Sequence, residues 1–270
     1  MDRLFKTALK QSVDPEKRGL ALSKRLYSQK SVMRYLLTLL LLCFATLVSA
    51  IDKAALFSEI ESLAAAGSPE AQYHLGMFYN NGIGTDKNPN EAFKWFQRSA
   101  RSGDPLGSYK LGCYYAGQGQ GVVENNKEKA LKYKLIAAES GYSYAQYDVA
   151  SIYYANGEIE DAIKWWKEAS AQGYLGAMYA LFTLYNQGEQ IPKDGVLSYG
   201  YLKIIESNAS KDQLAKIAAK LTELENELTD VELKRAQRFA SDWTPHKTPM
   251  TEKALNGLAE ASLLVKESTY

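Results

Sequence analysis

A unit of two short helices that recurs along the chain constrains the fold more than any other feature of the sequence. In the clearest copy, small and apolar side chains recur at helical spacing, first over 71–80 and again over 92–100. The Asn-Asn-Gly run ending at Gly82 separates the two helices, because asparagine and glycine tolerate the left-handed backbone of a helix end. Each helix has one apolar face and is too short to be stable alone, so the pair needs neighbours.

Three further copies follow at similar spacing. The glycine that closes the first unit, Gly103, is echoed by Gly141 and Gly173 and, less clearly, by Asn208, in steps of 38, 32 and 35 residues. A period in the thirties with two helices per unit is typical of repeat proteins whose units stack into one continuous core. The sequence therefore predicts an all-α fold, a right-handed α-solenoid of about four helix-turn-helix repeats with helical end caps.

The order of residues within the unit resembles the Sel-one-like repeat, a longer-looped relative of the tetratricopeptide repeat. The third copy lacks the Gly-x-Gly loop of this pattern, and the fourth is degenerate. The resemblance covers roughly residues 51–243 and implies a scaffold, because such repeats serve many uses without a common chemistry. The first copy carries the pattern at Ala71, Leu75, Gly76, Tyr79, Gly82, Gly84, Ala92, Trp95, Ala100 and Gly103, and the second keeps Leu111, Gly112, Tyr115 and Gly117.

Residues 1–50 predict a basic leader and a signal peptide. The apolar run Tyr35–Ala50 is shorter than the roughly 20 residues of a spanning helix, follows a basic stretch and ends in small residues. We expect cleavage before Ile51 and a periplasmic or secreted protein. The alternative is an uncleaved inner-membrane anchor with the repeats outside the cytoplasm, in which only this segment contacts the membrane. Because 32 residues before Met33 would make an unusually long leader, Met33 is a candidate for the true start.

The remaining boundaries follow from the repeat pattern. A solenoid with a leading helix is expected over 51–208 and two closing helices over 209–243, where Thr229 and Glu232 have capping-box spacing. Residues 244–270 contain two prolines and then a modest helical pattern, which predicts a partly ordered C-terminal tail that docks loosely.

Charge bears on the expected partners, and cysteine content bears on expected disulfides. Residues 1–50 hold 9 of the 32 Lys and Arg and 3 of the 31 Asp and Glu, which leaves 23 basic and 28 acidic residues after cleavage. A chain with a net charge of −5 does not attract phosphate backbones, so nucleic acid is not an expected partner. Only Cys113 remains after cleavage, so no intramolecular disulfide is expected, and its position predicts a small buried residue.

No motif predicts catalysis, a cofactor or a metal site. The chain has two histidines, whereas a zinc site needs three or four ligands. The glycine-rich run from Gly117 to Gly121 follows a helix and lacks the lysine of a phosphate loop, and Gly141–Ala145 lacks the last glycine of a nucleophile elbow. We therefore predict a protein that is not an enzyme. Some members of the Sel-one-like repeat family bind or cleave β-lactams. The alternative that this resemblance implies is an envelope enzyme or binder for β-lactam or peptidoglycan-like ligands.

One column of residues is a candidate binding site. A tyrosine stands two residues before each Leu75-equivalent, and four stacked first helices would align these side chains. In tetratricopeptide arrays this position lines the concave groove, which suits a protein or peptide partner, although the same tyrosines could instead pack between repeats. The predicted function is a partner-binding adaptor or assembly factor of the bacterial envelope; a secreted host-interacting factor is the other alternative. The four candidates are Tyr73, Tyr109, Tyr147 and Tyr179.

Overall fold

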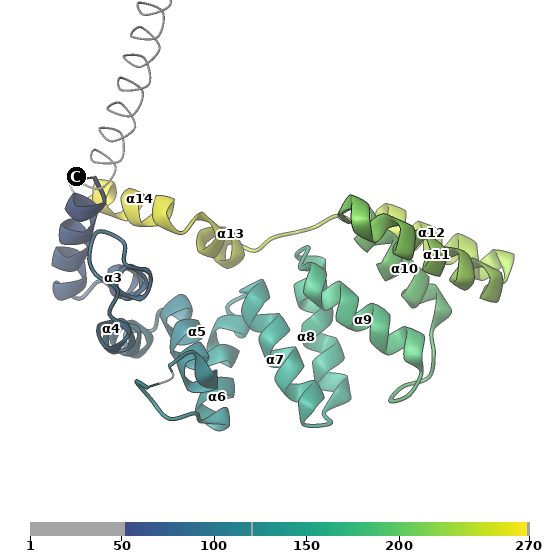
Figure 1. Ribbon diagram of the computed structural model, residues 1–270, viewed down its shortest axis with the longest axis horizontal. Coiled ribbons are helices and arrows are strands. Elements are labelled where there is room, and N and C mark those ends of the chain that lie inside the picture. The colour runs from purple at the N-terminus through teal and green to yellow at the C-terminus, as the bar shows by residue number, and fades with distance from the viewer. Residues whose placement is uncertain (1–51, 120, 269–270) are drawn as a thin grey trace, which may run out of the picture. The chain divides into compact units, whose positions relative to one another are not determined.

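The structure of the protein is a computed structural model that describes residues 52–119 and 121–268 (Figure 1). The chain divides into two compact units, Met1–Ala55 and Leu56–Tyr270. The predicted leader and signal peptide lie outside the described residues. Among the helices that are described, none is both long enough and apolar enough to cross a membrane.

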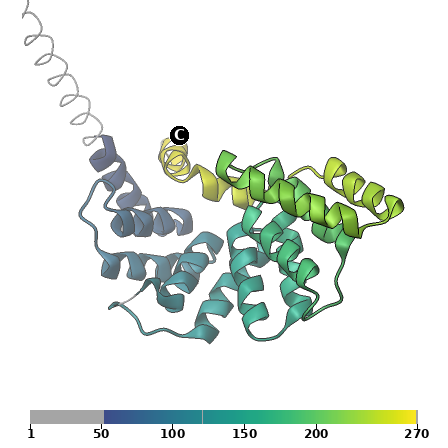
Figure 2. The same ribbon diagram turned by 45° about the vertical axis from the view of Figure 1, so that its right-hand side comes forward.

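In the second unit, the first and second helices of the repeats alternate along the chain, as the sequence predicts (Figures 1 and 2). Each repeat contributes a first and a second helix, and each helix packs against the next along the chain. Residues 56–65 add a leading helix. The all-α solenoid of four repeats is thereby confirmed. The first helices are α3 (Pro69–Asn81), α5 (Pro105–Cys113, continued by the π-helical turn Tyr114–Gln118), α7 (Ser143–Ala155) and α9 (Leu175–Gln187), and the second helices are α4 (Pro89–Arg101), α6 (Lys127–Glu139), α8 (Ile159–Ala171) and α10 (Gly195–Glu206).

Local signals explain where the early helices begin. Ser68 caps α3 through a hydrogen bond from the backbone N–H of Ala71, and a proline follows in the first turn, as the sequence predicts. Asp104 caps α5 in the same way, accepting from Gly107 N–H at 2.6 Å. These side chains satisfy backbone donors that the first turn of a helix leaves free.

Two glycines set how closely the helices of a pair approach. A Cβ on Gly76 would lie 2.6 Å from the Phe96 ring, and a Cβ on Gly112 would lie 2.9 Å from Cγ of Lys134. Any larger residue at either position would have to push the second helix away. These glycines therefore fix the spacing inside the first two units.

Two helices close the solenoid. They are α11 (Lys211–Glu227) and α12 (Asp230–Asp242), and both pack against α10. The capping box of α12 is present, with the side chains of Thr229 and Glu232 each bonded to the other residue's backbone N–H. On the inner side, the rings of Tyr201 and Phe239 meet edge to face at 5.2 Å.

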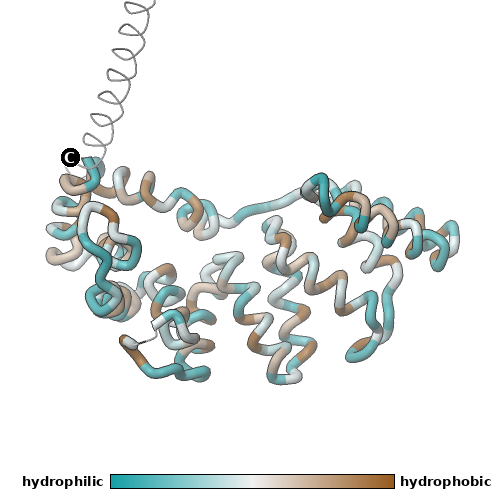
Figure 3. The backbone as a smooth tube through the Cα atoms, in the orientation of Figure 1, coloured by the Kyte–Doolittle hydropathy of each residue, from teal (hydrophilic) through white to brown (hydrophobic). Residues whose placement is uncertain are grey.

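Beyond α12 the structure differs from the loosely docked tail that the sequence predicts. A hydrophilic stretch, teal in Figure 3, leads to α13 (Pro249–Asn256) and α14 (Leu258–Ser268). The last helix returns to the first repeat and packs beside α3 (Figures 1 and 2). There Ala261 is fully buried against the cluster that contains Ile60 and Leu75. We call residues 244–268 the strap, because they join the closing helices to the first repeat.

Candidate functional site

The four predicted tyrosines occupy equivalent positions on α3, α5, α7 and α9, but their environments differ along the chain. Tyr73 is 7% exposed, Tyr109 and Tyr147 are half-buried, and Tyr179 is 36% exposed. The sequence alone treats the four as one column. The structure separates them into a packed pair and an open pair.

Tyr73 and Tyr109 are the packed pair. The Tyr73 ring lies 6.4 Å from the Phe96 ring inside the core, and burial raises its pKa. The Tyr109 hydroxyl donates a hydrogen bond to Asp148 at 3.2 Å, and its ring meets the Tyr142 ring edge to face at 5.0 Å. Burial also raises the pKa of Tyr109. Both side chains serve the packing between repeats.

Tyr147 and Tyr179 are the open pair, and they line one groove of about 390 Å³ between α7 and α9. Gly176 also lines the groove, and Trp166 from the second helix α8 contributes a further wall. The indole N–H of Trp166 is buried and has no hydrogen-bond partner among the described residues. We call this surface the tyrosine groove.

An aromatic ladder extends from the tyrosine groove toward α5. Tyr147 lies 4.9 Å from Tyr174, which lies 4.7 Å from Tyr144, which in turn lies 5.6 Å from Tyr142. Burial raises the pKa of Tyr174 to about 12. Sequence reasoning missed Tyr142, although its place directly after the closing glycine of a repeat, like that of Tyr174, is a usable signal.

The strap binds the turns that join successive repeats. The Thr251 hydroxyl accepts from the backbone N–H of Ser143 at 3.0 Å and lies 2.6 Å from the side-chain oxygen of Gln172. The Thr248 hydroxyl donates to the Gly141 carbonyl at 2.7 Å. Because α7 has no cap from its own N-cap residue, Thr251 supplies a partner for its first turn from 108 residues away.

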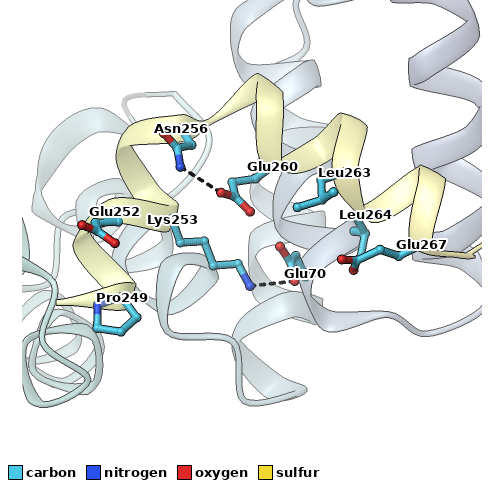
Figure 4. Close-up of a pocket in the computed structure, with 9 residues that line it drawn as sticks. All are labelled: Glu70, Pro249, Glu252, Lys253, Asn256, Glu260, Leu263, Leu264 and Glu267. Carbon is cyan, nitrogen blue, oxygen red and sulfur yellow. Dashed lines mark hydrogen bonds and ion pairs between the residues drawn. The ribbon is translucent and has the colours of Figure 1, made fainter.

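Figure 4 shows how the strap reaches the first repeat. Lys253 of α13 pairs with Glu70 of α3 at 2.7 Å, and Asn256 donates to Glu260 at 3.0 Å across a pocket of about 310 Å³. The buried ring of His74 also faces Glu70, at 3.7 Å. His74 and Lys253 together hold the pKa of Glu70 below its usual range.

The described residues give little material for metal or thiol chemistry. Among them, no group of three or more His, Cys, Asp and Glu side chains is placed to hold a metal ion. Cys113 is buried, as the sequence predicts, and burial raises the pKa of its thiol. A thiol in this state is protonated at neutral pH and weakly nucleophilic.

The fold and the groove define an α-solenoid repeat protein, and comparison with known proteins gives the family. The Sel1 repeat model matches residues 69–104, 105–142, 143–174 and 176–204, half of the chain, so the protein belongs to the Sel1 repeat family. Sel1 repeats generally mediate protein–protein interaction, and proteins built from them are typically non-catalytic scaffolds. The family expectation drawn from the residue pattern is confirmed.

Individual relatives support the fold over different lengths. The crystal structure of a Sel1 repeat protein from Oxalobacter formigenes is 26% identical, with a TM-score of 0.53, over 73% of this chain and 78% of the other. A sel1-like repeat-containing protein of Acanthamoeba polyphaga mimivirus, L21, is 31% identical over 46% of this chain, and the chitin synthase regulator SKT5 of Saccharomyces cerevisiae is 36% identical over 24%. The matches span only 22% and 10% of those two relatives' own lengths.

Proposed function

We propose that the protein is a non-catalytic scaffold that binds a segment of a partner protein in the tyrosine groove. The observation that carries this proposal is the separation of the four tyrosines. Tyr147 and Tyr179 line an open groove, whereas Tyr73 and Tyr109 are engaged in packing. The binding residues proposed here are therefore the open pair.

The chemistry of the groove suits a polypeptide. Tyrosine presents a broad apolar ring and a polar tip, and it loses little rotamer freedom on binding. The ladder that runs from Tyr147 through Tyr174 to Tyr144 extends this surface beyond a single pocket, and Tyr144 is 40% exposed. Ser151 and Thr183 add hydroxyls to the groove lining that can bond a partner's backbone.

We propose further that this scaffold is exported and acts as an adaptor or assembly factor of the bacterial envelope. The support is the sequence of residues 1–50, with a basic stretch, the apolar run Tyr35–Ala50 and small residues before Ile51. Mass spectrometry of the N-terminal peptide from cells tests this step. A mature chain that begins at Ile51 is expected, and a retained apolar run would favour the anchored form instead.

The binding proposal is tested by affinity capture of the tagged full chain from the cells that make it. Proteins recovered with the wild type are compared with those recovered with a Tyr147→Ala, Tyr179→Ala variant. Ile136→Ala is the matched control, because Ile136 on α6 is 36% exposed, the same fraction as Tyr179. The proposal expects a partner that the double variant loses and the control keeps. Equal recovery by all three chains would contradict it.

A further inference from the structure

Successive repeats meet at three interfaces, which we number first, second and third along the chain. Four equivalent positions face one another at each: one late in a first helix, two on the second helix of the same repeat and one on the next first helix. The equivalence follows from the register in which Gly76, Gly112 and Ala150 correspond. The four residues are Asn80, Phe93, Phe96 and Tyr114 at the first interface; Ala116, Leu131, Lys134 and Ile152 at the second; and Tyr154, Ile163, Trp166 and Leu184 at the third.

Aromatic rings fill the first interface and border an open groove at the third. At the first, the Tyr114 ring lies 5.7 Å from both Phe93 and Phe96, and its hydroxyl donates to Asn80 at 2.9 Å. Tyr114 is 2% exposed there. At the third, the rings of Tyr154 and Trp166 lie 5.3 Å apart, and both line the tyrosine groove together with Leu184.

The second interface has no ring at any of the four positions and contains a pocket of about 560 Å³ instead. All four of its residues line that pocket. Leu131, Ile152 and Ala116 are smaller than the aromatic and amide side chains that they replace, which leaves the space open. We call it the second-interface pocket.

Lys134 takes the place of the ring in a distinctive way. It is 7% exposed, and its ammonium donates to Oδ2 of Asp148 at 2.5 Å. The Tyr109 hydroxyl donates to the same oxygen at 3.2 Å. The charged pair is therefore satisfied at the pocket wall, and the rest of the lining is mostly apolar.

We propose that the second-interface pocket receives an aromatic side chain of a partner protein, in the space that Phe96 and Tyr114 occupy one repeat earlier. Leu131 and Ile152 offer apolar contact to a ring, and the Lys134 side chain, whose ammonium is held by Asp148, contributes a further part of the wall. Lys127 and Asn156 also line the pocket and supply polar atoms for a hydroxyl or indole N–H. The volume lies within the roughly 300–1,000 Å³ of ordinary ligand pockets.

The pocket adjoins the tyrosine groove, because Ser151 lines both. A partner segment that passes over α7 at Ser151 can therefore reach from the groove into the pocket. The inference rests on the proposed function in one respect, namely that the occupant is part of a protein. The ring specificity itself follows from the comparison of the first and second interfaces.

The test uses N-acetyl-L-tyrosinamide as the probe and the full chain with methyl-labelled isoleucine and leucine. We expect saturable shifts of the Ile152 and Leu131 methyl signals at about millimolar probe, the affinity that one buried side chain can supply. N-acetylglycinamide, which lacks the ring, should give none. Absence of a saturable tyrosinamide response would overturn the proposal.

Variants locate the response. Ile152→Trp fills the pocket and should abolish the shift of the Leu131 methyl, whereas Ile136→Trp, on the exposed face of α6, should keep it. If Ile152→Trp does not fold, Lys134→Phe restores the ring found at Phe96 and carries the same expectation. A shift that persists in a folded, filled variant contradicts the pocket.

The outcome is separable from that of the groove. A captured partner that depends on Tyr147 and Tyr179 but binds the Ile152→Trp variant unchanged would overturn the pocket and leave the groove proposal standing. Probe binding that Ile152→Trp abolishes, with no partner dependent on Tyr147 and Tyr179, supports the pocket and overturns the groove.

Discussion

The first and second interfaces are built from equivalent helices of successive repeats, yet one is filled by rings and the other is open. At the first, Phe93, Phe96 and Tyr114 contact one another; at the second, an ion pair between Lys134 and Asp148 borders a pocket. The helices keep their register in both, because a glycine of the first helix meets the same second-helix position, Phe96 in one repeat and Lys134 in the next, and an asparagine caps each second helix. This chain therefore holds an open pocket at one interface without a change of fold.

Removing a ring from the filled interface is expected to have the largest effect. Phe96 is fully buried, so Phe96→Ala should lower the free energy of unfolding by about 3–5 kcal/mol. Ile152→Ala should cost about 2 kcal/mol or less, because Ile152 is half-buried and already borders open space. Urea unfolding of the two variants measures both values. Equal losses would show that the second interface is as tightly packed as the first.

Breaking the ion pair comes next. Asp148→Ala leaves the nearly buried Lys134 ammonium without its carboxylate, and we expect a loss of about 2–3 kcal/mol, reduced from the fully buried case because the Asp148 side chain is 27% exposed. Lys134→Leu together with Asp148→Ala should recover much of it. The exposed pair of Lys193 and Glu227 is the control, where Glu227→Ala should leave the midpoint of unfolding close to that of wild type. A double variant as unstable as Asp148→Ala would argue against an unpaired charge as the cause.

The strap provides a smaller and independent test, because it holds the start of α7, the helix that borders the second interface. Thr251→Val keeps the shape of the side chain but leaves the Ser143 N–H and the Gln172 oxygen with one partner fewer. We expect a loss of about 1–2 kcal/mol in thermal unfolding. Thr222→Val, at an exposed hydroxyl on α11, should stay within about 0.5 kcal/mol of wild type. Equal losses of stability in the two variants would show that the strap does not stabilise the start of α7.

The smallest effect is expected where the strap meets the first repeat. The folded pKa of Glu70 is lowered, so the carboxylate stabilises the fold above its unfolded pKa of about 4.5, and this stabilisation is lost as pH falls through the folded pKa. Glu70→Gln should therefore cost less than about 1 kcal/mol at pH 7, since the site is partly exposed. Its difference from wild type should shrink as the pH is lowered below 4.5. A difference that stays constant with pH would assign the effect to packing.

The features that the sequence predicts correctly are local or repeated. Helix pairs follow from apolar spacing, and caps such as Ser68 and Thr229 follow from residues within one turn. The strap could not be predicted this way, because Thr248 and Thr251 meet Gln172 across 76 and 79 residues of chain with no periodic signal. The start of α13 follows from a local signal, the Thr248 cap and the proline after it. The docking of the strap on the repeats depends on non-local contacts.

The sequence predicts on which helices the four candidate tyrosines lie, but not how deeply each of them is buried. The spacing places all four tyrosines correctly on first helices, but their burial depends on neighbours in other repeats, such as Asp148 for Tyr109. The second-interface pocket is visible in sequence only as a lysine where Phe96 and Trp166 stand in other repeats. That substitution becomes informative only when residues from three helices are placed in one register.

The central claim, that a partner protein binds along the first helices α7 and α9, is tested most directly by photo-crosslinking in the cells that make the protein. A benzophenone amino acid is introduced at Tyr179 in one full-length chain and at Ile136 in another, two sites of equal exposure on a first and a second helix. We predict a discrete crosslinked partner from position 179 and none from position 136. The same products from both positions, or products only from position 136, would contradict binding in the tyrosine groove.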